Sequence, residues 1–301
     1  METNPALVAR LRAAGCVWAE DEAELLTAAA ASPAELDAMA ARRVAGEPLE
    51  QVVGWAEFHG LRVFVDPGVF VPRRRSEYLV DVALRLIAER TAQDQRVAGP
   101  PAAGQPVAGP PVIVDLCCGT GALGLAVAAA TGAANAGPVP PASGQAPADG
   151  PAPTSSAPPV RLYAADLDPA AVACARRNVE PAGGQVYAGD LFAALPGALR
   201  GQIDVLICNA PYVPTSDLVF MPAEAREHEA PMALDGGDDG LAVLRRAAAG
   251  ASNWLAPGGV LLVETSERQA LSMAAAMSAA GLTPAVHEDD ESDATVVTGM
   301  R

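Results

Sequence analysis

The stretch Val-Ile-Val-Asp-Leu-Cys-Cys-Gly-Thr-Gly, residues 112–121, decides the fold. Its first five residues are dominated by β-branched and aliphatic side chains, a pattern typical of a buried strand. The glycines that follow, Gly119 and Gly121, permit a tight turn and allow backbone to approach a ligand closely. Small residues over 121–130 then predict a helix. A strand, a glycine-bearing turn and a helix in this order indicate a cofactor-binding α/β domain.

The chain continues this alternation toward its C-terminus. Apolar or β-branched runs predict strands at 161–165, 185–188, 203–208, 260–263 and 295–298. Helical patterns fall between them at 169–178, 240–255 and 267–280. Alternating strands and helices favour a mostly parallel, doubly wound sheet with helices on both faces. Ligands of such sheets bind outside the carboxyl ends of the strands.

The N-terminal region has a different pattern. Helical spacing begins at Leu7, and Ser32-Pro33-Ala34-Glu35 predicts a capped second helix that reaches about residue 45. Aromatic and β-branched residues over 55–71 predict a hairpin, and a helix follows at 76–90. We therefore expect a helical domain with a hairpin over residues 1–75 and a catalytic domain over 76–301. Two segments rich in Ala, Pro, Gly and Gln, 92–110 and 132–159, predict a linker and a surface insertion.

Composition narrows the function classes. The 301 residues carry a formal net charge of −16, and every basic side chain other than histidine is an arginine. Such a field disfavours nucleic acid as a partner, whereas basic proteins remain possible partners. The five cysteines and three histidines show no metal-ligand spacing, so no metal site is expected. Reduced thiols and the absence of signal-peptide features in residues 1–13 predict a cytoplasmic protein.

Three acidic residues follow predicted strands and are candidates for cofactor contacts. Asp115 can accept hydrogen bonds from an ammonium group, Asp166 can hold both ribose hydroxyls, and Asp190 can accept from an adenine amino group. Leu191 can lie against the adenine ring. Each aspartate alone is as well explained as a loop or cap residue. Because Gly119, Gly121 and Gly124 nominally fit G-x-G-x-x-G, dinucleotide binding also remains open at this point.

Asn209-Ala210-Pro211-Tyr212 follows the strand predicted at 203–208 and carries the most specific chemistry. The nitrogen of an amide is a poor nucleophile, because its lone pair is delocalised into the carbonyl group. Two acceptors aimed at its N–H bonds can orient it for attack on carbon. The side-chain oxygen of Asn209 and the backbone carbonyl of Ala210 can supply them, while Pro211 stiffens the turn. Tyr212 offers a flat face for the planar amide and for a nearby cation.

This tetrapeptide resembles the [Asn/Asp/Ser]-Pro-Pro-[Tyr/Phe] motif of amino- and amide-methyltransferases. The whole chain resembles the protein-(glutamine-N5) methyltransferases that modify peptide chain release factors, as a divergent branch. Three further blocks carry the resemblance: residues 43–54 with 57–61, residues 71–73 with Glu77, and residues 233–241.

The resemblance implies a class I S-adenosylmethionine methyltransferase fold with a seven-stranded, mostly parallel sheet and a helical substrate-recognition domain. It implies that S-adenosylmethionine contacts a set of residues comprising Asp115, Cys117, Cys118, Gly119, Thr120, Gly121, Asp166, Asp190, Leu191 and Asn209. It implies that Asn209, Ala210, Pro211 and Tyr212 hold the glutamine of a Gly-Gly-Gln loop in a release factor. No membrane and no direct nucleic-acid contact are expected.

The sequence departs from the family pattern at three places. Ala210 replaces a proline, which leaves its carbonyl available but frees backbone entropy worth roughly 0.4–1 kcal/mol. The family's Pro-Arg-Pro-Glu-Thr-Glu becomes Pro-Arg-Arg-Arg-Ser-Glu at 72–77, where a solvated helix start and a substrate contact are equally good explanations. Cys117 and Cys118 replace a glycine-containing pair, and a structural role for these thiols is favoured over a reactive one.

Two alternatives stay open. The same tetrapeptide serves amino-methyltransferases that modify adenine in nucleic acid, although the net charge disfavours them. A binding module that keeps the fold without turnover is the second alternative. Calorimetry with S-adenosylmethionine, combined with assays on candidate acceptors, separates the three.

Overall fold

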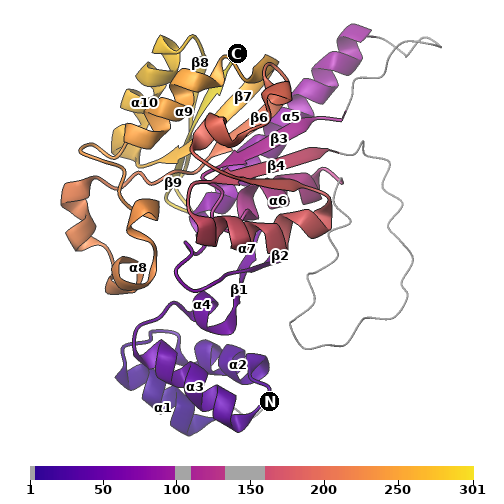
Figure 1. Ribbon diagram of the computed structural model, residues 1–301. Helices are drawn as coiled ribbons and strands as arrows, with labels where there is room; N and C mark the ends of the chain where they lie inside the picture. The colour runs from indigo at the N-terminus through magenta and orange to yellow at the C-terminus, as the bar shows by residue number, and fades with distance from the viewer. Residues whose placement is uncertain (1–3, 99–109, 133–159) are drawn as a thin grey trace, which may run out of the picture.

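The computed structural model describes residues 4–98, 110–132 and 160–301 (Figure 1). Most of the two low-complexity segments, 99–109 and 133–159, lies outside these residues. No helix in the described part of the chain is both long and apolar enough to cross a membrane.

The C-terminal part of the chain is built on a seven-stranded sheet. Its strands are β3 (Val112–Leu116), β4 (Arg161–Asp166), β5 (Gln185–Ala188), β6 (Ile203–Cys208), β7 (Leu255–Thr265), β8 (Thr283–Asp289) and β9 (Ala294–Met300). They lie in the order β5-β4-β3-β6-β7-β9-β8. β9 runs opposite to the other six strands, which all point the same way. The order reverses on either side of β3, so the carboxyl ends of β3 and its neighbours form the topological switch point. This is the doubly wound, mostly parallel fold predicted from the sequence.

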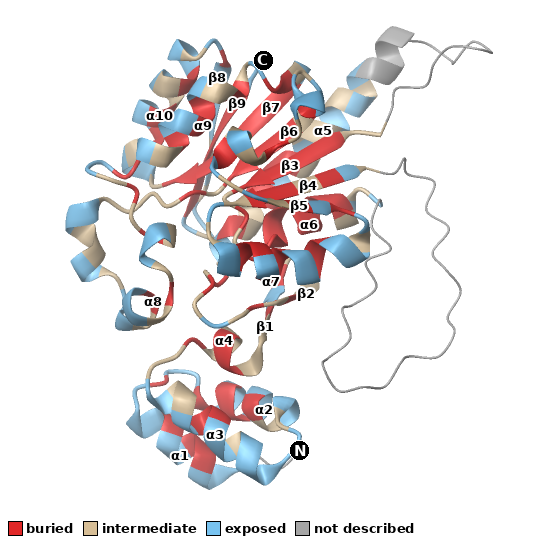
Figure 2. Ribbon diagram, viewed as in Figure 1, coloured by how far each residue is buried: buried red, intermediate tan, exposed pale blue. Residues whose placement is uncertain are grey.

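Helices cover both faces of the sheet. One face packs against α5 (Glu77–Ala98), α6 (Ala122–Ala130) and α7 (Pro169–Val179). The other packs against α9 (Ala242–Ala251) and α10 (Glu267–Ala279). Along β3 the side chains alternate between the two cores, with Ile113 on the first face and Val114 on the second. Figure 2 shows the central strands almost wholly buried, as expected for parallel strands covered on both sides.

The N-terminal residues form a separate small core. Helices α1 (Pro5–Ala13), α2 (Ala19–Ala29), α3 (Pro33–Val44) and α4 (Leu49–Val53) pack around Leu11 and Leu26. The Ser32 hydroxyl caps α3 by accepting from the Glu35 amide at 3.2 Å, as the sequence predicts. The predicted hairpin is formed by β1 (Trp55–Phe58) and β2 (Leu61–Phe64), which pair antiparallel. A short helical segment, α8 (Ala223–His228), lies beside this module in Figure 1.

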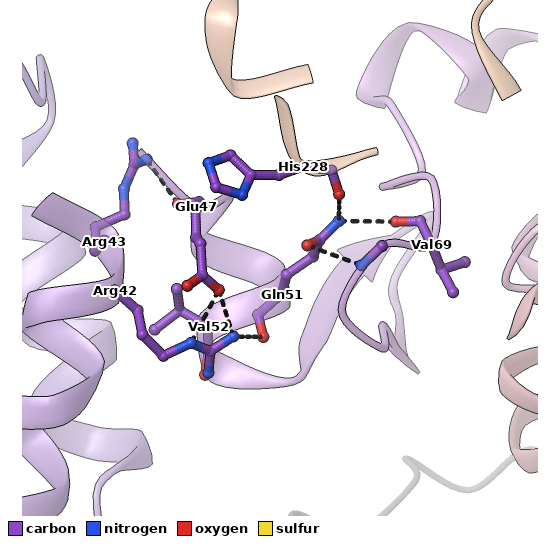
Figure 3. Close-up of polar contacts among 8 residues, drawn as sticks. Arg42, Arg43, Glu47, Gln51, Val52, Val69 and His228 are labelled. Carbon is purple, nitrogen blue, oxygen red and sulfur yellow. Dashed lines mark hydrogen bonds and ion pairs between the residues drawn. The ribbon is translucent and has the colours of Figure 1, made fainter. Parts of the chain in front are cut away.

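Gln51 ties the helical module to the rest of the chain (Figure 3). It is 3% exposed, and its side-chain nitrogen donates to the carbonyls of Val69 at 3.0 Å and His228 at 3.2 Å. Its side-chain oxygen accepts from the Gly68 amide at 3.2 Å. One buried amide therefore links α4, the segment that leads toward Arg73, and the end of α8. This contact explains in physical terms why the block at 43–54 carries a glutamine at position 51.

The structure differs from the predicted elements at several places. The helix predicted to end at residue 90 continues to Ala98, because residues 91–98 hold good helix formers and the first proline comes at 100. The helix predicted over 240–255 ends at Ala251, and β7 begins at Leu255. Strand β8 and helix α2 were not predicted. The side chains of β8 are mostly exposed, so the strand lacks a hydrophobic alternation.

Candidate active site

A cavity of about 200 Å³ opens at the carboxyl ends of β3, β4 and β6. Its walls come from the turn after β3, the ends of β4 and β5, the segment after β6 and the segment around Arg73. Eleven of the thirteen candidate residues named from the sequence line it: Cys117, Cys118, Gly119, Thr120, Asp166, Asp190, Leu191, Asn209, Ala210, Pro211 and Tyr212. Gly121 closes the turn after β3 without lining the cavity. The topology thus gathers four separate sequence motifs into one site.

The turn after β3 needs unusual backbone angles. Cys117, Gly119 and Gly121 have φ values of 54°, 56° and 78°, which lie in the left-handed region. A Cβ atom on Gly121 would also stand 2.7 Å from a methyl group of Val179 on α7. Glycine at 121 therefore serves both the turn and the close packing of two helices. The turn is closed by a hydrogen bond from the Gly121 amide to the Cys118 carbonyl at 2.7 Å.

Both cysteines of the turn are held as neutral thiols. A hydrogen bond with Cys208, together with burial, raises the pKa of Cys117 well above its ordinary value. Burial raises the pKa of Cys118 in the same direction. A thiol must ionise to act as a nucleophile, so these two side chains fit a structural role.

Asp166 at the end of β4 lies at the cavity wall. One carboxylate oxygen accepts from the Gly119 amide at 2.8 Å and the other from the Asp168 amide at 2.9 Å. Each oxygen keeps a further lone pair, which is the requirement for binding the two hydroxyls of a ribose. Burial raises the pKa of this carboxyl group despite the two backbone donors. Asp168 caps α7 through the Ala170 amide at 2.8 Å, as predicted.

The third candidate pair also faces the cavity. Asp190 pairs with Arg246 of α9 at 2.6 Å through one oxygen. Leu191 follows with a φ of 46° and is 8% exposed, so its side chain packs as a wall. The geometry is compatible with an adenine ring resting on Leu191.

Asp115 differs from the candidates that line the cavity. It is fully buried and does not line the cavity. One of its oxygens accepts from the Gly124 amide at 2.9 Å, and the other has no hydrogen-bond partner in the part of the chain that the structure describes. The direct ammonium contact expected from the sequence does not match this position. Because the side chain turns toward α6, it supports the turn from behind.

A pH dependence of stability follows from Asp115. Burial raises its pKa to about 7, so the folded protein keeps a proton that the unfolded chain releases near its ordinary value. The stability contributed by the protonated form is complete below about pH 4 and is lost as the pH rises through about 7. Between pH 5 and 8 the wild type should lose on the order of 2–3 kcal/mol of stability relative to Asp115→Asn. Denaturant unfolding of both proteins at the two pH values measures this difference, and parallel pH profiles would refute it.

The segment after β6 presents acceptors to the cavity. The side-chain nitrogen of Asn209 donates toward two adjacent oxygens, that of the Glu264 carboxylate at 3.2 Å and that of the Ser76 hydroxyl at 3.3 Å. Within the described residues, neither the side-chain oxygen of Asn209 nor the carbonyl of Ala210 accepts a hydrogen bond. Tyr212 stands beside them, with its hydroxyl donating to Glu264 at 2.6 Å. Two free acceptors and a flat ring are the arrangement that an amide or amino group requires.

A glycine-rich loop after α8 supports this segment from behind. The Gly236 amide donates to the Val213 carbonyl at 2.8 Å, and the Gln269 side chain donates to the Tyr212 carbonyl at 2.8 Å. A Cβ atom on Gly236 would lie 2.7 Å from the Pro211 carbonyl oxygen, and one on Gly240 would lie 2.2 Å from that of Tyr212. The block at 233–241 therefore keeps its glycines because backbone meets backbone here.

Two arginines of the Arg73–Arg75 cluster face the cavity. One guanidinium nitrogen of Arg73 donates to both carboxylate oxygens of Glu229, at 2.6 and 2.7 Å, and the Glu229 side chain is fully buried. Arg75 pairs with Glu264 at 3.1 Å and lies 5.6 Å over the ring of Tyr212. The cluster is thus more than a solvated helix start, since two of its three members are tied to the walls of the site.

Comparisons with known proteins agree with this geometry. The family model UPF0020, the RMKL-like methyltransferase domain, matches residues 107–215. A release factor glutamine methyltransferase of Streptomyces coelicolor is 34% identical, covering 76% of this chain and 66% of its own length. Another from Geobacter sulfurreducens is 30% identical over 90% of this chain and 80% of its own. The chain belongs to the release factor glutamine methyltransferase family.

A third relative is named for a different kind of methyl acceptor. A 4-amino-L-phenylalanine/4-methylamino-L-phenylalanine methyltransferase of Streptomyces pristinaespiralis is 32% identical, covering 80% of this chain and 68% of its own length. That name describes an aromatic amine in place of a side-chain amide.

The residues present fit the cofactor of a methyltransferase of this family, S-adenosylmethionine. The turn at 117–121 brings backbone to the cavity, Asp166 would offer carboxylate lone pairs to the ribose hydroxyls, and Leu191 would offer an apolar wall to the adenine. When bound, the cofactor supplies an electrophilic methyl group on a sulfonium. The task of the protein is then to place a nitrogen lone pair in line with that carbon and to exclude water.

Several residues of the site were missed at the level of sequence. Ser76, Glu264 and Gln269 contact the acceptor segment, and Glu229 holds the Val71 amide and Arg73 at the cavity wall. Glu264 had a detectable signal, because it is an acidic residue that follows the apolar run Val-Leu-Leu-Val of a parallel strand. Asn178 was also missed. Its side chain joins the Thr120 carbonyl to the Phe64 backbone of the hairpin.

Proposed function

We propose that this enzyme transfers the methyl group of S-adenosylmethionine to the side-chain amide nitrogen of a protein glutamine. The observation that carries the proposal is the pair of unengaged acceptors, the Asn209 side-chain oxygen and the Ala210 carbonyl, beside Tyr212 at the cavity. An amide NH₂ group offers two donors in one plane, which matches two acceptors that converge from one turn. The relatives named for release factor glutamine support the same acceptor.

The chemistry needs no side-chain base. Hydrogen bonds from the two amide N–H groups to these acceptors orient the nitrogen, so that its lone pair can point toward the methyl carbon. The methylated amide would carry an extra proton and lose it readily to water. Catalysis then consists of positioning together with electrostatic support for the developing charge.

We further propose that the substrate is the Gly-Gly-Gln glutamine of a peptide chain release factor in the cytoplasm. The helical module over residues 1–75 would recognise the body of that protein. This role is supported by the hydrogen bonds of Gln51, which connect the module to the segment that leads into Arg73 and the cavity. The overall charge of −16 suits a protein substrate and disfavours adenine in nucleic acid.

An aromatic amine is a second candidate acceptor. It is favoured by the Streptomyces pristinaespiralis relative and by Arg75, whose guanidinium lies beside Tyr212 and is partly exposed. Such a cation could receive the carboxylate of a free amino acid. The two candidates share the site and differ in what lies beyond the reacting nitrogen.

Labelled methyl transfer distinguishes these acceptors. We expect incorporation into a purified release factor that carries Gly-Gly-Gln and none into the same factor with its glutamine replaced by alanine. The aromatic-amine acceptor tested in parallel is 4-amino-L-phenylalanine at saturating concentration. Transfer to this amine alone would overturn the protein-glutamine proposal, and label in the alanine variant would place the methyl group elsewhere on the factor.

A further inference from the structure

We propose that Glu264 is a positioning residue for the acceptor nitrogen, because its carboxylate determines which end of the Asn209 amide faces the substrate. The inference rests on the proposed function for the identity of the acceptor. It concerns a residue that neither the tetrapeptide motif nor the comparisons assign. The argument starts from where the sheet places this side chain.

The sheet register brings Glu264 to Asn209. Strands β6 and β7 are parallel, and Ile207 is paired with Leu262. Two residues further along each strand come Asn209 and Glu264, so their side chains point to the same face of the sheet at its carboxyl edge. Glu264 is 2% exposed. Its two neighbours along β7, Val263 and Thr265, are directed to the other face of the sheet, because side chains alternate along a strand.

Four donors converge on the Glu264 carboxylate. One oxygen accepts from the Ser76 hydroxyl at 2.5 Å and from the Asn209 amide at 3.2 Å. The other accepts from the Tyr212 hydroxyl at 2.6 Å and pairs with Arg75 at 3.1 Å. A buried carboxylate is costly unless such partners satisfy it, so the network is built around the charge. All four partners line the acceptor end of the cavity.

The network removes the two-fold ambiguity of the Asn209 amide. A side-chain amide can be turned by half a rotation with little change in shape, exchanging donor and acceptor. Here the side-chain nitrogen faces two adjacent acceptors, the Glu264 carboxylate and the Ser76 oxygen, and donates to both. The side-chain oxygen is therefore the atom left for the substrate. The reversed orientation would place an NH₂ group against the NH₂ group of the acceptor and leave donors unpaired.

The same carboxylate holds the flat wall of the site. Burial, and then the charge of Glu264, raise the pKa of Tyr212, so its hydroxyl stays protonated and donates. The ring is thereby kept beside Asn209, with the Arg75 guanidinium over it. Glu264 thus acts through Asn209 and Tyr212, and it does not need to touch the reacting atoms.

Glu264→Gln is the principal test, with transfer rates measured on the acceptor that wild type methylates best. Gln keeps the size of the side chain but replaces one acceptor oxygen by a donor. We expect kcat to fall by about 100-fold, the scale of a misplaced reacting group, with the dissociation constant of S-adenosylmethionine unchanged within about twofold. Glu267→Gln, an exposed neighbour at the start of α10, is the matched control and should retain the wild-type rate.

Further variants separate positioning from stability. Ser76→Ala should lose part of the rate, Ser76→Thr should restore it through the retained hydroxyl, and Ser76→Ala added to Glu264→Gln should cost little more. Additive losses, or a rate for Glu264→Gln above half of wild type, would overturn the proposal. Thermal unfolding of each variant identifies any that fail to fold.

A spectroscopic readout makes the test independent of the acceptor. The side-chain amide resonances of Asn209, assigned by their absence in Asn209→Ala, should shift in Glu264→Gln and stay unchanged in Glu267→Gln. Unchanged Asn209 resonances in Glu264→Gln would refute the positioning role even if no acceptor were methylated. A wild-type enzyme that methylates an amine but not glutamine would refute the proposed function. The comparison of Glu264→Gln with Glu267→Gln would still test the positioning role on that amine.

Discussion

Asn209→Ala is expected to lower the rate of methyl transfer by about 100- to 1,000-fold while leaving the protein folded. The loss follows from removal of one of the two acceptors that orient the substrate nitrogen. Deletion of a single aimed hydrogen-bonding group in a water-excluded site has effects of this size. The side chain is partly exposed to the cavity, so its truncation leaves no large void in the core.

The loss should appear in kcat, because the hydrogen bonds of Asn209 matter most as the amide distorts toward attack. Asn209→Asp provides a stricter variant. It keeps an oxygen toward the substrate but places a second carboxylate against Glu264, where the amide nitrogen now lies at 3.2 Å. We expect it to be as impaired as the alanine variant.

Initial rates with saturating S-adenosylmethionine measure the effect. The exposed Asn253, in the turn before β7, is the matched control position, and Asn253→Ala should behave as wild type. An Asn209→Ala enzyme with a near-normal rate would remove this residue from the mechanism.

Gly240→Ala is also expected to lower the rate of transfer by about 100-fold. Its φ of 77° is strained for alanine, and the new Cβ atom would lie 2.2 Å from the Tyr212 carbonyl oxygen and 2.4 Å from the Gln269 side-chain nitrogen. Atoms cannot remain at these distances, so the loop or the acceptor segment must shift. A displacement near 1 Å at the reacting group accounts for a loss of this order.

Gly258→Ala separates the clash from the backbone strain. Gly258 has a φ of 74°, but a Cβ atom there would meet nothing within 4 Å. Both variants should lose a similar amount of stability from the left-handed backbone, on the order of 1 kcal/mol. Only Gly240→Ala should lose the rate of transfer. Equal activity of the two variants would show that the glycine-rich loop does not support the acceptor segment.

The sheet was accessible to prediction because its central strands are buried on both faces. Apolar runs such as 203–208 stand out between glycines and polar helices, and the structure confirms this strand to the residue. Strand β8 was not accessible, because it lies at the edge of the sheet, contains Pro284 and exposes most of its side chains. The over-long helix at 240–255 has a similar cause, since Trp254 and Leu255 extend its apolar pattern although they are buried in the adjoining turn and strand.

The site was predictable where a motif carries its own chemistry. Asn209 and Tyr212 follow from the demands of an amide acceptor, and Asp166 follows from the end of a strand. Asp115 could not be placed correctly, because a sequence does not show whether a carboxylate at a strand end turns toward the cavity or toward the next helix. Glu264 could not be assigned because its role depends on Ser76, which is 188 residues distant in the chain.

The central claim is that the enzyme methylates a glutamine side chain in a protein. Quantitative mass spectrometry of tryptic peptides, from cells with the protein and from cells that lack it, tests this claim most directly. We predict a peptide from a release factor whose Gly-Gly-Gln glutamine carries one added methyl group, present with wild type and absent both without the protein and with Asn209→Ala. Equal glutamine methylation in all three samples, or loss of methylation only at other residue types, would contradict the account.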